Sequence, residues 1–274
     1  MLTALQLQEL ASFAKTIRKE TILQIATLGV GHIGGALSIV DILALLYTNV
    51  MNIRPDDPLW EGRDVLILSK GHAGPALYAT LSEKGFFSSS WLRTLNKGGT
   101  RLPSHCDRLK TPGIDMSTGS LGQGLSVACG VAYGRKLDGN GCHIYAIIGD
   151  GESQEGQIWE AAMFAAQYKL GHVIAFTDFN KLQIDGTIEQ IIGLEDLQAK
   201  WQAFGWHTQR VDGHDFQQMH EAILKAKEDT ARPSMIILDT IKGKGALFCE
   251  GAVTNHNMKV DMDTAMRAIA ELEG

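Results

Sequence analysis

Residues 149–186 read GDGESQEGQIWEAAMFAAQYKLGHVIAFTDFNKLQIDG. A glycine–aspartate–glycine turn opens this stretch and directly follows the apolar run CHIYAII (142–148). Apolar residues at helical spacing come next (156–168), then a second apolar run, HVIAFTD (172–178), and Asn180. A strand, a helix and a second strand in this order predict one unit of a parallel sheet.

The same alternation continues on both sides of this unit. Further strands are predicted at 64–69, 207–211 and 234–240, and helices at 5–28, 36–50, 74–84, 124–137, 195–204, 216–227 and 261–272. The glycine-rich run GVGHIGG (29–35) is expected to be a loop between the first two helices. Short apolar runs separated by helices predict an α/β fold, a doubly wound, mostly parallel sheet with helices on both faces. No repeat or linker interrupts the chain, so residues 1–274 are interpreted as one domain.

Composition limits the classes of function. The chain has 274 residues, of which 45% are hydrophobic and 20% charged, as in an ordinary globular domain. The net charge of −6 is spread along the sequence, which argues against a nucleic acid or a membrane surface as partner. Four widely spaced cysteines fit reduced thiols in the cytoplasm. The longest apolar stretch, 36–48, contains Asp41, so neither a signal peptide nor a membrane span is predicted.

The opening turn indicates an anion site with one carboxylate. In a doubly wound sheet, ligands bind at the carboxyl ends of the strands, where Asp150 is predicted to lie. Its flanking glycines, Gly149 and Gly151, allow the backbone to approach a diphosphate closely. A carboxylate beside a diphosphate requires a hard cation between them, which Mg²⁺ supplies. The amide oxygen of Asn180 and the main-chain carbonyl of Leu182 complete the predicted metal ligands.

Taken alone, a Gly-Asp-Gly sequence is an ordinary turn, and the other motifs decide between these interpretations. The 38-residue stretch resembles the thiamine diphosphate binding motif of the transketolase family. Five further segments resemble transketolase motifs and occur in the family's order: GHIGGALS (31–38), LSKGHAGPALYATL (68–81), SHCD (104–107), TGSLGQGLS (118–126) and DGHD (212–215). The resemblance implies the thiamine diphosphate binding fold, with thiamine diphosphate and Mg²⁺ as cofactors and Ca²⁺ or Mn²⁺ as substitutes for the metal.

The resemblance also implies roles for particular residues. The candidate catalytic residues are His32, His72, His105 and His256, of which His32 and His105 would face the sugar and His72 the diphosphate. The cofactor site implied by the family comprises His72, Gly119, Ser120, Leu121, Asp150, Gly151, Glu155, Asn180 and His256. Glu155 also resembles a family glutamate close to the contact between subunits. Lys242 and Lys244 are equally well interpreted as diphosphate ligands or as solvated loop residues.

The remaining histidines are expected to be structural. His143, His172, His207 and His220 fall in predicted strands or helices without a glycine-rich or loop setting. His214 is expected in a turn, with Asp215 as the cap of the following helix.

The resemblance covers only the first part of full-length transketolases, which continue with a pyrimidine-binding domain. Because the chain stops at Gly274, it is interpreted as the N-terminal subunit of a split transketolase. The implied partner is a C-terminal subunit carrying the pyrimidine-binding domain, in an α2β2 assembly that transfers a two-carbon ketol unit from a ketose phosphate or related sugar to an aldose. The isolated chain is expected to be inactive, and the donor sugar stays open.

Three alternatives compete with this interpretation. The α subunit of a 2-oxo acid dehydrogenase shares the Gly-Asp-Gly turn and the later asparagine, but SKGH and TGSLGQG argue against it. A 1-deoxyxylulose-5-phosphate synthase carries its own pyrimidine domain in a longer chain. A non-catalytic diphosphate-binding module has no use for the loop histidines, and no GxGxxG follows the first strand.

Overall fold

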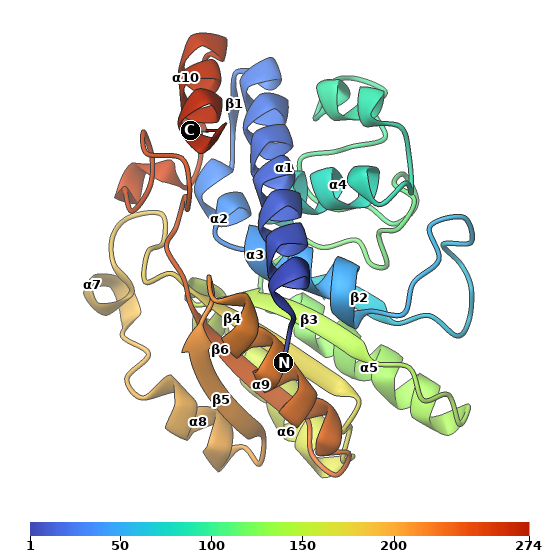
Figure 1. Ribbon diagram of the computed structural model, residues 1–274. Coiled ribbons are helices and arrows are strands. Elements are labelled where there is room, and N and C mark those ends of the chain that lie inside the picture. The colour runs from blue at the N-terminus through green and yellow to red at the C-terminus, as the bar shows by residue number, and fades with distance from the viewer. Residues whose placement is uncertain (274) are drawn as a thin grey trace.

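The computed structural model describes residues 1–273 and is built around a five-stranded parallel sheet (Figure 1). The strand order is β2-β3-β4-β6-β5, and every neighbouring pair is parallel. The strands are β2 (Val65–Leu68), β3 (Ile144–Gly149), β4 (Val173–Phe179), β5 (His207–Asp212) and β6 (Ser234–Asp239). All five coincide with predicted strands, so the parallel sheet is confirmed.

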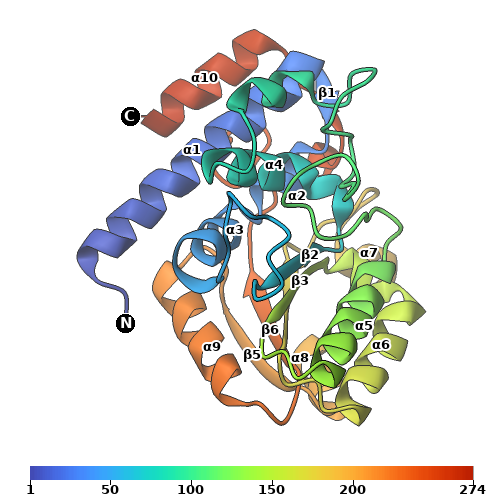
Figure 2. The same cartoon turned by 90° about the vertical axis from the view of Figure 1, so that its right-hand side faces the viewer.

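Both faces of the sheet are buried, because alternate side chains of β2, β3, β4 and β6 enter different cores. In β3, Tyr145 and Ile147 pack in one core, whereas Ala146 and Ile148 pack in the other. The first core is covered by α9 and by the N-terminal helices, and the second by α5, α6 and α8. Figure 2 shows the two layers on opposite sides of the strands. The doubly wound α/β class is therefore confirmed.

The helices that cover the sheet and those gathered at one end of it form separate groups (Figures 1 and 2). Those beside the sheet are α5 (Gln123–Leu137), α6 (Gly156–Gln167), α8 (Leu197–Ala203) and α9 (Phe216–Glu228). Those gathered mainly at one end are α1 (Ala4–Leu28), α2 (Ile33–Leu37), α3 (Val40–Leu45), α4 (Gly74–Glu83) and α10 (Met262–Glu273). The predicted cap is confirmed, because Asp215 accepts hydrogen bonds from the N–H groups of Gln217 and Gln218 at the start of α9.

The segment 29–50 differs from the prediction. The expected loop at 29–35 ends in helix α2, and the expected continuous helix at 36–50 is divided into α2, α3 and a π-helical turn. Gly34 and Gly35 lie within α2, where a larger residue has little room: a Cβ at Gly34 would collide with the Asn255 side chain, and one at Gly35 would lie a tight 3.2 Å from Nε2 of His72. Tight packing, rather than chain reversal, therefore explains these glycines.

Two small features were not predicted. A short helix, α7 (Ile188–Ile192), follows β4, and a two-stranded antiparallel ribbon joins β1 (Val30–Gly31) to β7 (Met258–Lys259). The ribbon ties the segment before α2 to the C-terminal region.

One segment of the described chain is long and apolar enough to span a membrane. It is Ile33–Val50, with a mean hydropathy of 1.7. Because 83% of this window is buried inside the structure, it packs as part of the protein core.

Candidate active site

A cavity of about 330 Å³ lies at the carboxyl ends of β3 and β4. The predicted site residues that line it are His32, His72, His105, Gly119, Leu121, Asp150, Gly151, Glu155, Asn180, Leu182 and His256. Ser120 does not line the cavity; it is exposed between Gly119 and Leu121. Segments separated by more than two hundred residues thus converge on one site.

Asp150 lies at the base of the cavity and is 3% exposed. Its Oδ1 accepts a hydrogen bond from the N–H of Gly151 at 2.7 Å, and its Oδ2 from the N–H of Lys181 at 2.5 Å. The second bond joins the end of β3 to the loop after β4, because Lys181 lies in that loop between Asn180 and Leu182. Burial and the nearby carboxylate of Asp178 raise the pKa of Asp150 to about 7, against the two hydrogen bonds. A bound cation would favour the ionised form.

The donor set around Asp150 fits a hard divalent cation. Asn180 and Leu182 line the same cavity as Asp150, so the three residues offer it a carboxylate, an amide oxygen and a main-chain carbonyl. The amide oxygen of Asn180 accepts a hydrogen bond from the N–H of Leu182 at 3.1 Å. The ammonium of Lys242 lies 3.2 Å from the carbonyl oxygen of Leu182, so this oxygen is already directed at a positive charge. Hard oxygen donors of these three kinds are the ligands that Mg²⁺ prefers in proteins.

The four candidate catalytic histidines form one cluster. The ring of His32 lies 5.3 Å from those of His72 and His256 and 5.6 Å from that of His105, centroid to centroid. His72 and His256 are 5.1 Å apart. These residues come from the start of α2, a 3₁₀ turn before α4, the loop before α5, and a turn near the C-terminus. The structure therefore brings together all four histidines that the sequence singled out.

The clustered histidines are held neutral. Burial, followed by the charge of Lys70, lowers the pKa of His72 well below its ordinary value. Burial and the nearby Lys242 lower the pKa of His256 to about 4. Burial is also the main cause of the lowered pKa values of His32 and His105. Each neutral ring has one donor and one acceptor nitrogen at neutral pH, which suits hydrogen bonding to hydroxyl and carbonyl groups.

Residues 10–270 match the family described as "Transketolase, thiamine diphosphate binding domain". This chain belongs to the transketolase family. Its cavity therefore lies in the thiamine diphosphate binding domain of that family. A crystal structure of a transketolase from Pichia stipitis superimposes with a TM-score of 0.90 at 30% identity, and covers 96% of this chain. The match includes 40% of that crystallised chain, so this chain spans about two fifths of its length.

Relatives of similar length carry more specific names. The 6-deoxy-6-sulfo-D-fructose transketolase subunit SqwG of Clostridium sp. (strain MSTE9) is 56% identical, over 95% of this chain and 94% of its own. An apulose-4-phosphate transketolase subunit of Actinobacillus succinogenes is 38% identical, over 98% of each chain. Human transketolase is 36% identical over 97% of this chain but only 42% of its own length.

Beneath the transketolase site lies a buried ion pair that the sequence analysis did not single out. The ammonium of Lys70 and the carboxylate of Asp178 are 2.5 Å apart, and their side chains are 3% and 0% exposed. Asp178 also accepts hydrogen bonds from Ser38, Thr240 and Asn180. Asn180 donates to Asp178 through its amide nitrogen, so the amide oxygen of Asn180 points away from Asp178. Asp178 therefore orients a proposed metal ligand.

Glu152, rather than Glu155, holds the glycine turns of the site. The buried Glu152 carboxylate accepts hydrogen bonds from the N–H groups of Gly122 at 2.8 Å and Gly149 at 3.0 Å, and from the Ser69 hydroxyl. Glu155 is exposed at the start of α6 and lines the cavity wall. A signal for Glu152 was present in the sequence, since it follows Asp150 by two residues, but its partners lie far away along the chain.

The structure distinguishes the two lysines that the sequence left equivalent. Lys242 is 2% exposed and lines the cavity, with its ammonium 3.5 Å from Nδ1 of His256. Lys244 instead lies 3.4 Å from the carboxylate of Glu250 and is not part of the cavity wall. Burial and the charge of Lys70 lower the pKa of Lys242 to about 8. Lys242 is thus the lysine directed into the site.

The other histidines lie outside the cavity wall, as the sequence predicts. His143 and His172 neighbour each other at the opposite ends of the strands, 5.1 Å apart. His207 begins β5 and His220 lies in α9. His214 follows β5 in a turn, but its ring makes two hydrogen bonds, to Asp41 and to the N–H of Ile241, that the prediction did not include.

Gly119 holds the backbone beside His105 and allows a direct test of the cavity wall. Its φ is +142°, and a Cβ there would lie 2.9 Å from the His105 ring. Gly119→Ala is expected to lower the free energy of unfolding by about 1–3 kcal/mol and to displace His105. Thermal unfolding and a crystal structure would measure both effects.

Gly99→Ala is the matched control, because Gly99 also has a positive φ (+77°) but open space around it. An unchanged position of His105 in Gly119→Ala, or equal losses of stability in the two variants, would contradict the role given to the Gly119 contact.

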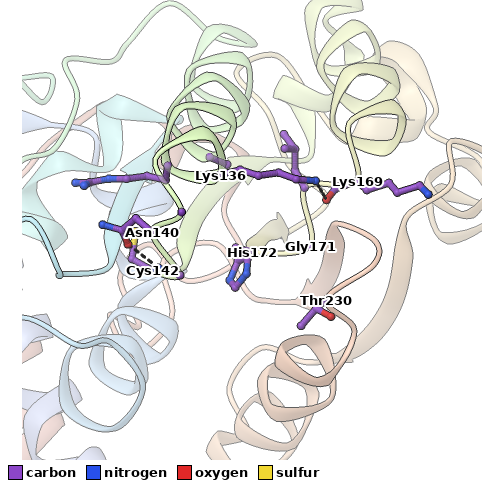
Figure 3. A pocket seen from close by; sticks show the side chains of 12 residues that line it. Lys136, Asn140, Cys142, Lys169, Gly171, His172 and Thr230 are labelled. Atoms are coloured by element: carbon purple, nitrogen blue, oxygen red, sulfur yellow. Dashed lines mark hydrogen bonds between the residues drawn. The ribbon is translucent and has the colours of Figure 1, made fainter.

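A second cavity, of about 270 Å³, lies at the amino ends of the strands (Figure 3). Its lysines do not converge on a ligand position. Lys136 donates hydrogen bonds to the carbonyl oxygens of Tyr168 and Lys169, at 2.8 and 3.1 Å. The Lys169 side chain points away from the cavity in Figure 3. The chemistry therefore belongs to the cavity at the carboxyl ends.

Proposed function

We propose that this chain is the diphosphate-binding subunit of a two-subunit transketolase. The observation that carries the proposal is the convergence of Asp150, Asn180 and Leu182 with four neutral histidines in one cavity. The names and lengths of the relatives support the division into subunits. We further propose that residues 1–274 form one domain and that the enzyme works in the cytoplasm, where four buried thiols stay reduced.

Asp150, Asn180 and Leu182 would hold Mg²⁺, or Ca²⁺ or Mn²⁺ in its place, and through it the diphosphate. His72, His256 and Lys242 face the same region and supply donors and positive charge. Gly151 and the backbone at Gly119 and Leu121 form the wall against which the cofactor rests. When bound, thiamine diphosphate supplies the nucleophilic carbon and the electron sink for cleavage of a ketose carbon–carbon bond.

His32 and His105 would hold the sugar. The hydroxyl of Ser104 contacts Nδ1 of His105 at 3.0 Å, which leaves Nε2 for a substrate hydroxyl or carbonyl. His32 is partly buried next to three other rings, which favours its neutral form, so it can donate or accept one hydrogen bond at the reacting carbonyl.

The partner is proposed to be a C-terminal transketolase subunit with a pyrimidine-binding domain, in an α2β2 assembly. Leu121 and Ile184 support this, because both line the cavity while remaining 37% and 64% exposed. Apolar side chains at the mouth of a polar cavity are typical of a surface that a second chain covers. The donor proposed first is 6-deoxy-6-sulfo-D-fructose, on the basis of the 56% identical relative. A branched sugar phosphate is the second candidate, on the basis of the apulose-4-phosphate relatives.

Ligand-dependent melting tests this proposal against a different diphosphate-binding protein. The chain assembled with the product of the neighbouring reading frame is expected to melt at a higher temperature with thiamine diphosphate and Mg²⁺, because a ligand that binds only the native state stabilises it. NAD should leave the melting temperature unchanged. The assembled mass is expected to equal two copies of each chain. Stabilisation by NAD alone, or a failure of the two chains to associate, would refute the proposal.

A further inference from the structure

A buried carboxylate far from the metal ligands joins three separate segments. Asp41, in α3, is 5% exposed. Its Oδ2 accepts hydrogen bonds from Nη2 of Arg18, in α1, at 2.5 Å and from Nδ1 of His214 at 2.7 Å. Burial would raise the pKa of Asp41, but these two partners together lower it, so the carboxylate is ionised at neutral pH.

Both partners of Asp41 also form hydrogen bonds with the same loop. Nε2 of His214 accepts a hydrogen bond from the N–H of Ile241 at 2.9 Å, and Nε of Arg18 donates to the carbonyl oxygen of Lys244 at 3.1 Å. Because a backbone N–H can only donate, Nε2 is the acceptor and Nδ1 carries the proton directed at Asp41. Asp41 is therefore connected to both ends of the segment 241–244.

Lys242 lies between these two anchored positions. The N–H of Gly243 also donates to the carbonyl oxygen of Gly34 at 2.9 Å, so the backbone on the far side of Lys242 is fixed as well. From this backbone the Lys242 side chain reaches the cavity, where its ammonium lies 3.2 Å from the Leu182 carbonyl. The anchoring bonds and the buried ammonium belong to one continuous structure.

We propose that Asp41, acting through His214 and Arg18, positions Lys242 for the diphosphate of the cofactor. The three residues do not line the cavity and are positioning residues. The inference rests on the proposed function, because it assigns Lys242 to the diphosphate.

The physical reason is that Lys242 occupies an unfavourable place in the absence of a ligand. Burial of its ammonium and repulsion from Lys70 outweigh the attraction of Asp150 and Asp178, and lysine has a flexible stem with several rotatable bonds. On a freely moving loop such a side chain would turn toward water. Anchoring the backbone at Ile241 and Lys244 removes that alternative, so the site needs less reorganisation when the diphosphate arrives.

A double-mutant cycle tests whether His214 acts through Lys242. Thiamine diphosphate with Mg²⁺ is titrated calorimetrically into the chain assembled with its partner. His214→Ala and Lys242→Met are each expected to weaken binding about 10-fold or more, as loss of a supporting partner does elsewhere. The double variant is expected to bind no more weakly than Lys242→Met. Additive losses, or wild-type affinity in His214→Ala, would overturn the proposal.

His207→Ala is the matched control, because it removes the histidine that begins β5, at the end of the strand away from His214, and is expected to leave affinity unchanged. His214→Asn serves where His214→Ala fails to fold: it keeps a donor for Asp41 and loses the acceptor for Ile241. The same loss of affinity is expected from it.

Hydrogen exchange separates a failure of this inference from a failure of the proposed function. In the assembled protein without cofactor, His214→Ala and His214→Asn are expected to speed exchange at the amide of Ile241 and its neighbours. Unchanged exchange there would refute the anchoring by itself. A wild-type assembly that binds no thiamine diphosphate would instead refute the proposed function, whatever the exchange result.

Discussion

Asp150→Asn is expected to remove measurable binding of Mg²⁺ and thiamine diphosphate and to lower ketol transfer by the assembled enzyme at least about 100-fold. Asp150 supplies the only carboxylate among the proposed metal ligands. The carboxylate now accepts hydrogen bonds from the N–H groups of Gly151 and Lys181. An asparagine would turn its own amide hydrogens toward one of these N–H groups, so one of the two bonds would be lost. Calorimetric titration and a transfer assay measure the two losses.

The loss should come from the site and not from unfolding. Asp150 is buried near Asp178, so its charge is unfavourable in the protein without metal, and its removal should not lower the melting temperature of that form greatly. Asp215→Asn is the matched control, because asparagine also caps a helix and Asp215 lies outside the cavity. Metal-dependent activity retained by Asp150→Asn would refute the assignment of this carboxylate.

Asp178→Asn is expected to lower the free energy of unfolding by about 3–5 kcal/mol, because it leaves the Lys70 ammonium buried without a counter-charge. Ser38 donates to Oδ2 and Thr240 to Oδ1, and the single amide oxygen of an asparagine can accept only one of these bonds, so the loss includes a hydrogen bond as well as the ion pair. Chemical denaturation of the assembled protein measures the change. A loss below about 1 kcal/mol would mean that Lys70 reaches water when Asp178 is neutral.

The double variant Lys70→Met/Asp178→Asn gives the matched comparison. It contains no buried charge at this position, so it is expected to recover a large part of the stability lost in Asp178→Asn. A double variant that is less stable than Asp178→Asn alone would show that Lys70 stabilises the fold by other contacts.

The sheet could be predicted from the sequence because its signal is local. Four of the five strands are short apolar runs, and residues such as Tyr145 and Ile147 alternate with Ala146 and Ile148 between two buried cores. The segment 29–50 was predicted wrongly because glycine can mark either a loop or a place where two segments pack closely. At Gly34 and Gly35 it allows close contact with Asn255 and His72, and those neighbours are distant in sequence.

In the candidate site, too, residues with a local sequence signal could be predicted and those that depend on distant contacts could not. Asp150 and Asn180 were found because each follows a strand, and adjacent parallel strands end at the same edge. The Lys70–Asp178 pair joins positions 108 residues apart, and neither residue has a local signal of pairing. Lys242 and Lys244 could not be distinguished, because the direction of each side chain depends on the positive φ values of Gly243 and Gly245 and on contacts with other segments.

The most direct test of the central claim is ketol transfer measured with this chain alone, with its partner chain alone, and with both. Thiamine diphosphate, Mg²⁺ and an aldose acceptor are supplied, with 6-deoxy-6-sulfo-D-fructose and sugar phosphates as donors. We predict transfer only when both chains are present. Substantial transfer by this chain alone would contradict a site that needs a second subunit, and no transfer with any donor by the assembled pair would contradict the proposed transketolase activity.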